Sequence, residues 1–204
     1  MTRQDIFKEE LGSIKSKDLR SLASFVLDSL TSSFFTLDAG YEHFKDERGK
    51  GGLVLHTKRV CKVGEKIIGG KKSSRCFDPD IVRLGCLFHD ICKPSSNHPE
   101  EGFRYFLSLV DSIETTHPQD LDPYFNNPKS LVFKIKVVAR TIRAHHGRFG
   151  WYRGVYTEDR IVHLADYIAA FYGENLNYRK LPRNIQEELS SIERELEKGT
   201  KSQL

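Results

Sequence analysis

The residues of this chain with the clearest chemical potential are histidines and aspartates that lie on or beside apolar stripes. Residues 87–94 read LFHDICKP, in which His89 directly precedes Asp90. The other members of the set are His56, His98, His145, His146 and Asp166. Burying several imidazoles and two carboxylates without partners is costly, and a shared divalent cation would satisfy them together. Because imidazole and carboxylate ligands without thiolates suit manganese, iron, zinc or cobalt, the set indicates a metal site.

Each of these residues also has an ordinary structural explanation. A single histidine that faces a core is usually hydrogen-bonded to the backbone or to a carboxylate. An aspartate at a helix end is usually a cap. Several such residues on separate stripes favour one shared site over several unrelated ones. For His163, three residues before Asp166, a partner of a ligand and a simple core residue both stay open.

Lys93 adds a positive charge to the predicted site. It follows His89 by four residues and Asp90 by three, a spacing that returns it to their face of a helix. A divalent metal can activate water and neutralise charge on phosphoryl oxygens. We therefore expect Asp90 and Lys93 to serve catalysis of phosphate hydrolysis, with Lys93 on a nonbridging phosphate oxygen.

The stretch GRFGWYRGVY, residues 147–156, is the most suggestive segment outside these ligands. Aromatic rings can stack on bases, and arginines can donate two hydrogen bonds to a phosphate. Arg148, Trp151 and Arg153 are accordingly predicted to bind substrate. The alternative is a surface loop that its aromatic residues anchor.

Helical spacing of apolar residues runs through most of the sequence and predicts an all-α fold. The expected helices span about 17–36, 54–68, 98–114, 130–146, 157–172 and 183–198, with a further helix that starts at Asp78-Pro79 and stops before Pro94. One domain over 1–204 follows, with its core at about 34–172. The last helix has a narrow apolar stripe that would pack on the domain or pair with another copy in a homo-oligomer.

The bulk properties set outer bounds on function. The 204 residues carry a formal net charge of +4, which mildly favours anionic partners. No apolar stretch approaches the ~20 residues that cross a bilayer, and the N-terminus MTRQDIFKEEL is too polar for a secretory signal. A cytoplasmic protein without membrane contact is expected. The four cysteines form no C-x-x-C pair and are expected to be reduced thiols, with zinc ligation by Cys92 as an alternative.

The ordered set His56, His89-Asp90 and Asp166 resembles the HD superfamily of metal-dependent phosphohydrolases. Five local strings carry the resemblance over about residues 34–172: GGLVLHT, LFHDICKP, HPEEGFRYF, IRAHHGRFG and EDRIVHLADYIAA. The resemblance implies an all-α fold with the metal site between central helices. Cys92 departs from the usual glycine after the doublet.

Within the superfamily the sequence is most similar to the branch with extra histidines, which includes 3′→5′ exoribonucleases and the HD nucleases of CRISPR systems. That likeness implies one or two divalent ions (Mn, Co, Fe, Zn, Ni or Mg). A first ion would be held by His56, His89, Asp90 and Asp166, and a second by His98, His145 and His146, with Asp90 as the bridge. The stretch that contains His43 is loosely similar to a histidine-bearing segment of the exonucleases.

These patterns predict a metal-dependent phosphohydrolase that cleaves a phosphoester or phosphoanhydride bond of a nucleotide or short nucleic acid. A 3′→5′ exonuclease on single-stranded RNA or DNA is the alternative. The exoribonucleases carry a nucleic-acid-binding barrel before this domain, and none is seen here, which favours nucleotides over long polymers. A non-catalytic nucleotide-sensing module is a third class, which the complete ligand set disfavours.

Overall fold

The computed structural model describes residues 2–70, 77–115, 128–147, 152, 154–174 and 177–201. All regular elements of these residues are helices, so the predicted all-α class is confirmed. Two of them are single 3₁₀ turns, η1 (Lys45–Glu47) and η3 (Tyr178–Lys180). Within the described ranges, no helix combines the length and the apolar character that a bilayer span requires.

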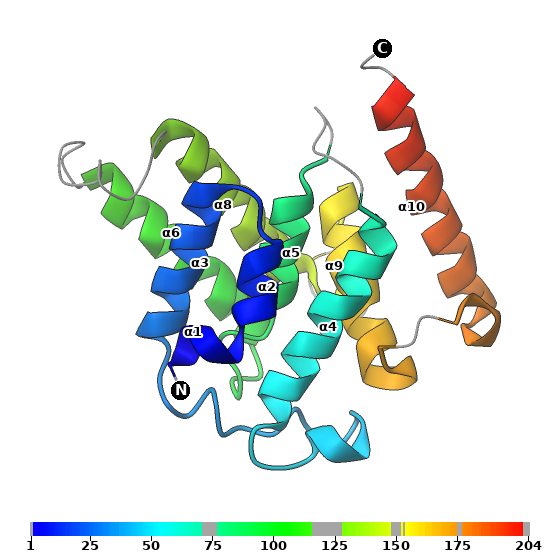
Figure 1. Ribbon diagram of the computed structural model, residues 1–204, viewed down its shortest axis with the longest axis horizontal. Coiled ribbons are helices and arrows are strands. Elements are labelled where there is room, and N and C mark those ends of the chain that lie inside the picture. Colours follow the sequence, from blue (N-terminus) through cyan, green and yellow to red (C-terminus); the bar gives the residue numbers. More distant parts are fainter. Residues whose placement is uncertain are drawn as a thin grey trace.

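Three helices at the N-terminus pack together beside the central helices (Figure 1). They are α1 (Arg3–Ile6), α2 (Lys8–Ser13) and α3 (Lys17–Ser29). The expectation that α3 reaches residue 36 is wrong, because the helix ends at Leu30. Side-chain hydroxyls compete with the helix there: Thr31 bonds Ser33 at 2.5 Å, and Thr36 donates to the carbonyl of Ser33.

Three central helices form the scaffold of the molecule: α4 (Gly52–Ile68), α5 (Pro79–Phe88) and α9 (Thr157–Tyr172). Each packs on the other two, and α5 also packs on α2 and α3. The predicted start of α5 is confirmed, since the Asp78 side chain accepts the backbone N–H of Asp80 and Pro79 takes the first turn. The helix ends at Phe88, earlier than expected, so the His89-Asp90 doublet lies in the turns that follow.

Two further helices, α6 (His98–Thr115) and α8 (Pro128–Ala144), pack against each other. The expected extension of α8 to residue 146 is wrong: Ala144 ends the helix, and His145 and His146 lie in a turn that leads to Gly147, with a φ of +55°. A left-handed residue there reverses the chain at low cost only because it is glycine.

Gly85 lets α5 approach both α8 and α9. A Cβ at this position would lie 2.8 Å from the Cγ2 atoms of Thr141 and Val162. Both neighbours are fully buried. The helix that bears Asp166 and the two helices that lead into His89 and His145 thus meet at one small residue.

The last helix, α10 (Arg183–Lys201), lies along the outside of the molecule next to α9 (Figure 1). Its predicted apolar stripe, Ile185, Leu189, Ile192 and Leu196, is buried within the chain. Arg160 of α9 holds it with ion pairs to Glu188 at 2.7 Å and Glu195 at 2.6 Å. Local packing therefore covers this stripe, and association with a second copy stays a prediction.

Candidate metal centre

The predicted ligands are brought together from separate helices or helix ends. His56 comes from α4 and Asp166 from α9, while His98 begins α6. The His89-Asp90 and His145-His146 pairs follow the ends of α5 and α8. Most of the set is buried, with exposed fractions of 0% for His56, His89 and His145 and 3% for Asp90. The helix ends explain how adjacent residues can face one point, which the side of a helix does not allow.

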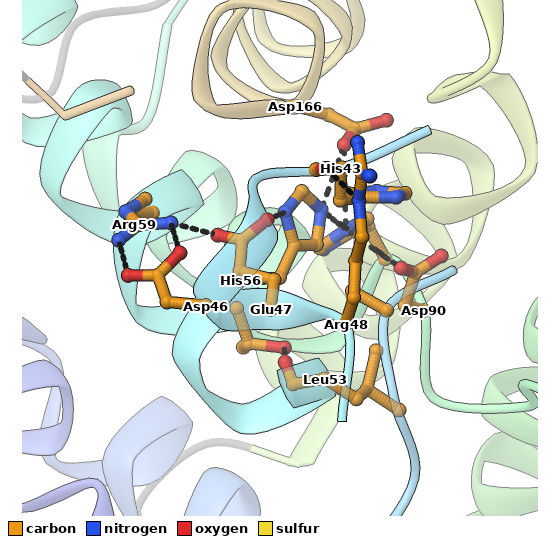
Figure 2. A network of polar contacts seen from close by, with 12 residues as sticks. His43, Asp46, Glu47, Arg48, Leu53, His56, Arg59, Asp90 and Asp166 are labelled. Carbon is orange, nitrogen blue, oxygen red and sulfur yellow. Dashed lines mark hydrogen bonds and ion pairs between the residues drawn. The ribbon is translucent and has the colours of Figure 1, made fainter. Parts of the chain in front are cut away.

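The first group gathers around His56 and Asp166. The Nε2 atom of His56 lies 3.0 Å from Oδ1 of Asp166 (Figure 2). The same atom lies 3.4 Å from Nε2 of His89. The Oδ2 atom of Asp90 lies 3.3 Å from His89 Nε2 and 4.0 Å from His56 Nε2. Ligand atoms of His56, His89 and Asp90 lie within 4.8 Å of one another, close enough for one ion.

The second group consists of His98, His145 and His146, whose ligand atoms also lie within 4.8 Å of one another. The other oxygen of Asp90, Oδ1, faces this group, 3.0 Å from Nε2 of His98 and 3.6 Å from Nε2 of His145. Each carboxylate oxygen of Asp90 thus faces a different group of histidines, as a bridging ligand would.

Backbone carbonyls fix the orientation of three of these imidazoles. The Nδ1 atoms of His89, His98 and His145 lie 2.9, 2.9 and 2.7 Å from the carbonyl oxygens of Cys86, Ser95 and Ile142. In each case the acceptor is three residues earlier. A carbonyl only accepts, so Nδ1 carries a hydrogen, and each ring, when neutral, presents the Nε2 lone pair to the centre.

Two of the nitrogens that face the centre indicate whether these residues suit a metal ion. The Nε2 atoms of His98 and His145 are buried and make no hydrogen bond, although Oδ1 of Asp90 lies 3.0 and 3.6 Å from them. Such groups are costly unless something pairs with them. Imidazole lone pairs beside a carboxylate are the donor set of a divalent transition metal, so the residues present fit such an ion.

A family comparison agrees with this geometry. The model of the HD domain matches residues 53–170, more than half of the chain. The chain belongs to the HD domain family. Members of this family are typically metal-dependent phosphohydrolases. No curated protein and no solved structure matches the chain, and the family match does not choose among branches of HD domains.

Charge in the centre of this HD domain favours ionised aspartates and a neutral His145. Burial alone would raise the pKa of Asp90, but the charges of His89 and Lys93 outweigh it and hold the pKa well below its usual range. The pKa of Asp166 is lowered too, because the hydrogen bond with His56 and the charge of His89 outweigh burial. Burial, with the charge of His89, lowers the pKa of His145. These are the protonation states in which the side chains bind metal.

His56 differs from the other histidines. Burial alone would lower its pKa, but hydrogen bonds with Asp166 and Glu47 outweigh it and raise the pKa to about 9. In the metal-free protein at neutral pH the ring of His56 is therefore protonated, and the proton on Nε2 lies toward Asp166. A cation that takes this place must displace the proton.

Lys93 lies beside the aspartate of the HD doublet. Its Nζ atom is 2.8 Å from Oδ2 of Asp90 and donates to the carbonyl of Ala39 at 3.3 Å. Burial would lower the pKa of Lys93, but Asp90 raises it, so the ammonium stays charged. The predicted substrate-binding residues Arg148, Trp151 and Arg153 lie outside the described residues.

The structure places three residues beside the centre that the predicted ligand set did not include. Glu47, from the polar segment before α4, is fully buried beside His56. The ring centre of His43, which lies in the stretch with only a loose likeness to the exonucleases, is 4.4 Å from that of His56. His163 contacts the backbone of a predicted ligand, since its Nδ1 is 2.7 Å from the carbonyl oxygen of His145. Among these, His43 and His163 had a signal in the sequence, and Glu47 had none.

Proposed function

We propose that this HD domain hydrolyses a phosphoester or phosphoanhydride bond of a nucleotide or short nucleic acid. The observation that carries the proposal is Asp90, whose two oxygens face two groups of buried histidines. Lys93 lies 2.8 Å from the same carboxylate. A carboxylate shared by two sets of nitrogen donors, with an ammonium at its side, suits a substrate that brings negative charge to the centre.

Some residues of the site would hold the metal ions, and Lys93 would bind the substrate. His56, His89, Asp90 and Asp166 would hold one divalent ion, and His98, His145 and His146 a second, from among Mn, Co, Fe, Zn, Ni and Mg. When bound, such an ion lowers the pKa of water and neutralises charge on phosphoryl oxygens. Lys93 would donate to a nonbridging phosphate oxygen, because its charge is maintained by Asp90.

A set of stacked rings next to the second histidine group supports a substrate with a base. The guanidinium of Arg143 lies 3.3 Å from the ring centre of Tyr152 and 4.5 Å from that of Phe103. Arg143 precedes His145 by two residues and bonds Glu100, which follows His98 by two. Tyr152 keeps 42% of its surface exposed, so a substrate could reach this side chain, and aromatic rings can stack on bases.

The test is hydrolysis measured over a panel of metals and substrates. Manganese, cobalt, zinc and magnesium are each combined with nucleoside monophosphates, triphosphates, cyclic nucleotides and short single strands. The wild type is compared with Asp90→Ala, His89→Ala and, as a matched control, Glu9→Ala, which removes an exposed carboxylate of α2. We expect the first two variants to lose bound metal and activity, and the control to keep both.

The outcomes separate the proposal from its alternatives. Unchanged metal content and hydrolysis in Asp90→Ala would refute it. Release of 3′-terminal nucleotides from single strands, without hydrolysis of free nucleotides, would favour the exonuclease. Nucleotide binding without turnover under any metal would favour the sensing module.

A further inference from the structure

Glu47 is a buried carboxylate that the proposed chemistry does not use. It lies in η1, before α4, and none of its surface is exposed. Its Oε1 atom accepts a hydrogen bond from Arg59 at 2.6 Å. Its Oε2 atom lies 3.5 Å from Nδ1 of His56, an ion-pair contact, and neither of these two buried atoms makes a hydrogen bond (Figure 2).

His56 needs this partner because it lies inside a helix. The other three oriented histidines use the carbonyl three residues earlier, at or beyond a helix end. For His56 that carbonyl belongs to Leu53, which already accepts the hydroxyl of Thr57 at 2.9 Å. A side chain must therefore orient the ring, and Glu47 is the one that faces its Nδ1.

The carboxylate of Glu47 is itself held in place. Arg59 bonds both Glu47 and Asp46, the latter at 2.6 and 3.2 Å, which directs the free oxygen of Glu47 toward His56. The segment can lie this close to α4 because residue 52 is glycine: a Cβ there would come within 1.7 Å of the Glu47 carbonyl oxygen. Figure 2 shows the resulting chain from Asp46 through Arg59 and Glu47 to His56 and Asp166.

We propose that Glu47 is a positioning residue that holds the hydrogen of His56 on Nδ1 and so frees Nε2 for an ion in the first group. The inference rests on the proposed metal centre. A carboxylate accepts but does not donate, so it selects one tautomer, as the carbonyls do for His89, His98 and His145. Glu47 acts only on the first group, since its contact is with His56 alone among the predicted ligands.

Glu47→Gln provides a sharp test, because it keeps the shape of the side chain and replaces the acceptor that faces His56 with a donor. Arg59 donates to residue 47, so the amide oxygen must face Arg59 and the amide NH₂ must face His56. An NH₂ group favours the tautomer with hydrogen on Nε2, which cannot bind a metal. Glu47→Ala leaves room for water, which can accept from Nδ1. We therefore expect Glu47→Gln to bind metal no more tightly than Glu47→Ala. The opposite order is expected for stability, where Glu47→Gln, which keeps the shape of the side chain, should be the more stable variant.

The experiment uses the full chain with zinc as the probe. Zinc affinity and stoichiometry are measured by competition with a chelating dye, and the imidazole ¹⁵N signals of the zinc-loaded protein report the tautomer of His56. Urea unfolding measures stability separately. The control is Asp46→Asn, which alters the contact with Arg59 but does not touch His56.

We expect Glu47→Gln to bind one zinc ion about 10–100-fold more weakly while the other stays bound, the usual range for loss of a partner behind a ligand. Asp46→Asn should retain both ions. Wild-type zinc affinity and tautomer in Glu47→Gln would overturn this inference and leave the proposed function standing. A wild type that binds no zinc, manganese or cobalt would overturn both.

Discussion

Replacing Gly85 by alanine tests how closely α5, α8 and α9 are packed, because the loss of stability from crowding should exceed the gain from helix propensity. The added Cβ would lie 2.8 Å from the Cγ2 atoms of Thr141 and Val162, against an ordinary carbon contact of about 3.5–4.0 Å. Neither neighbour can turn aside. Both are β-branched and buried, and the Thr141 hydroxyl is held by Val137 and Asp159.

Relief of these contacts requires the helices to separate by roughly 0.7 Å. Such overpacking costs about 1–3 kcal/mol, while alanine gains up to ~1 kcal/mol in helix propensity. With the full gain subtracted, we expect Gly85→Ala to lower the free energy of unfolding by up to about 2 kcal/mol, measured with urea. Metal affinity should fall as well, because the three helices carry His89, His145 and Asp166.

The matched control is Gly12→Ala in α2, where an added Cβ meets nothing within 4 Å. It should leave stability unchanged or raise it by up to ~1 kcal/mol. If Gly85→Ala proves as stable as the wild type with unaltered metal affinity, the close approach of these helices does not limit the site, and the reasoning is refuted.

Three further predictions concern the metal, pH and the last helix. Chelation should lower the melting temperature, since an ion at 100 times its Kd adds about 2.7 kcal/mol; Asp90→Ala should show no such shift, and an equal shift in both proteins would contradict the assignment. In the metal-free protein, the pKa of His56 is raised to about 9, so its contribution to stability is full below about pH 6.5 and is lost as the pH rises through 9. Urea unfolding across this range should show the loss in the wild type and not in His56→Asn; a parallel loss in both would assign it to another group. Ile192→Ala, on the buried stripe of α10, should cost about 2–5 kcal/mol, whereas exposed Arg194→Ala should be near neutral; equal effects in calorimetry would show that α10 does not depend on this stripe.

Local patterns predict the central helices well. Thr157–Tyr172 forms a helix with the expected bounds, and α5 starts at the expected cap. These signals succeed because each depends on neighbouring residues alone. Helix ends were less predictable: apolar spacing continues past Leu30, but hydroxyls of Thr31 and Thr36 bond locally and end the helix. The two short N-terminal helices lack a long periodic stripe.

The candidate site likewise contains residues that the sequence predicts and a residue that it does not. His89, Asp90 and Asp166 lie on strongly apolar stripes, which is why the sequence brings them to attention. Glu47 lies in a run of charged residues that reads as a solvated loop. Its burial depends on Arg59, twelve residues later, and on the close approach that Gly52 allows. Such a pairing has no periodicity to reveal it.

The two ways of orienting imidazoles imply unequal tolerance to mutation. The acceptors for His98 and His145 are main-chain oxygens of Ser95 and Ile142, which every amino acid possesses. No change of side chain at those two positions deletes the acceptor. The partner of His56 is a side chain, and a single codon change at Glu47 removes it. The orientation of His89, His98 and His145 is thus set by the path of the backbone, whereas that of His56 depends on a side chain that mutation can remove.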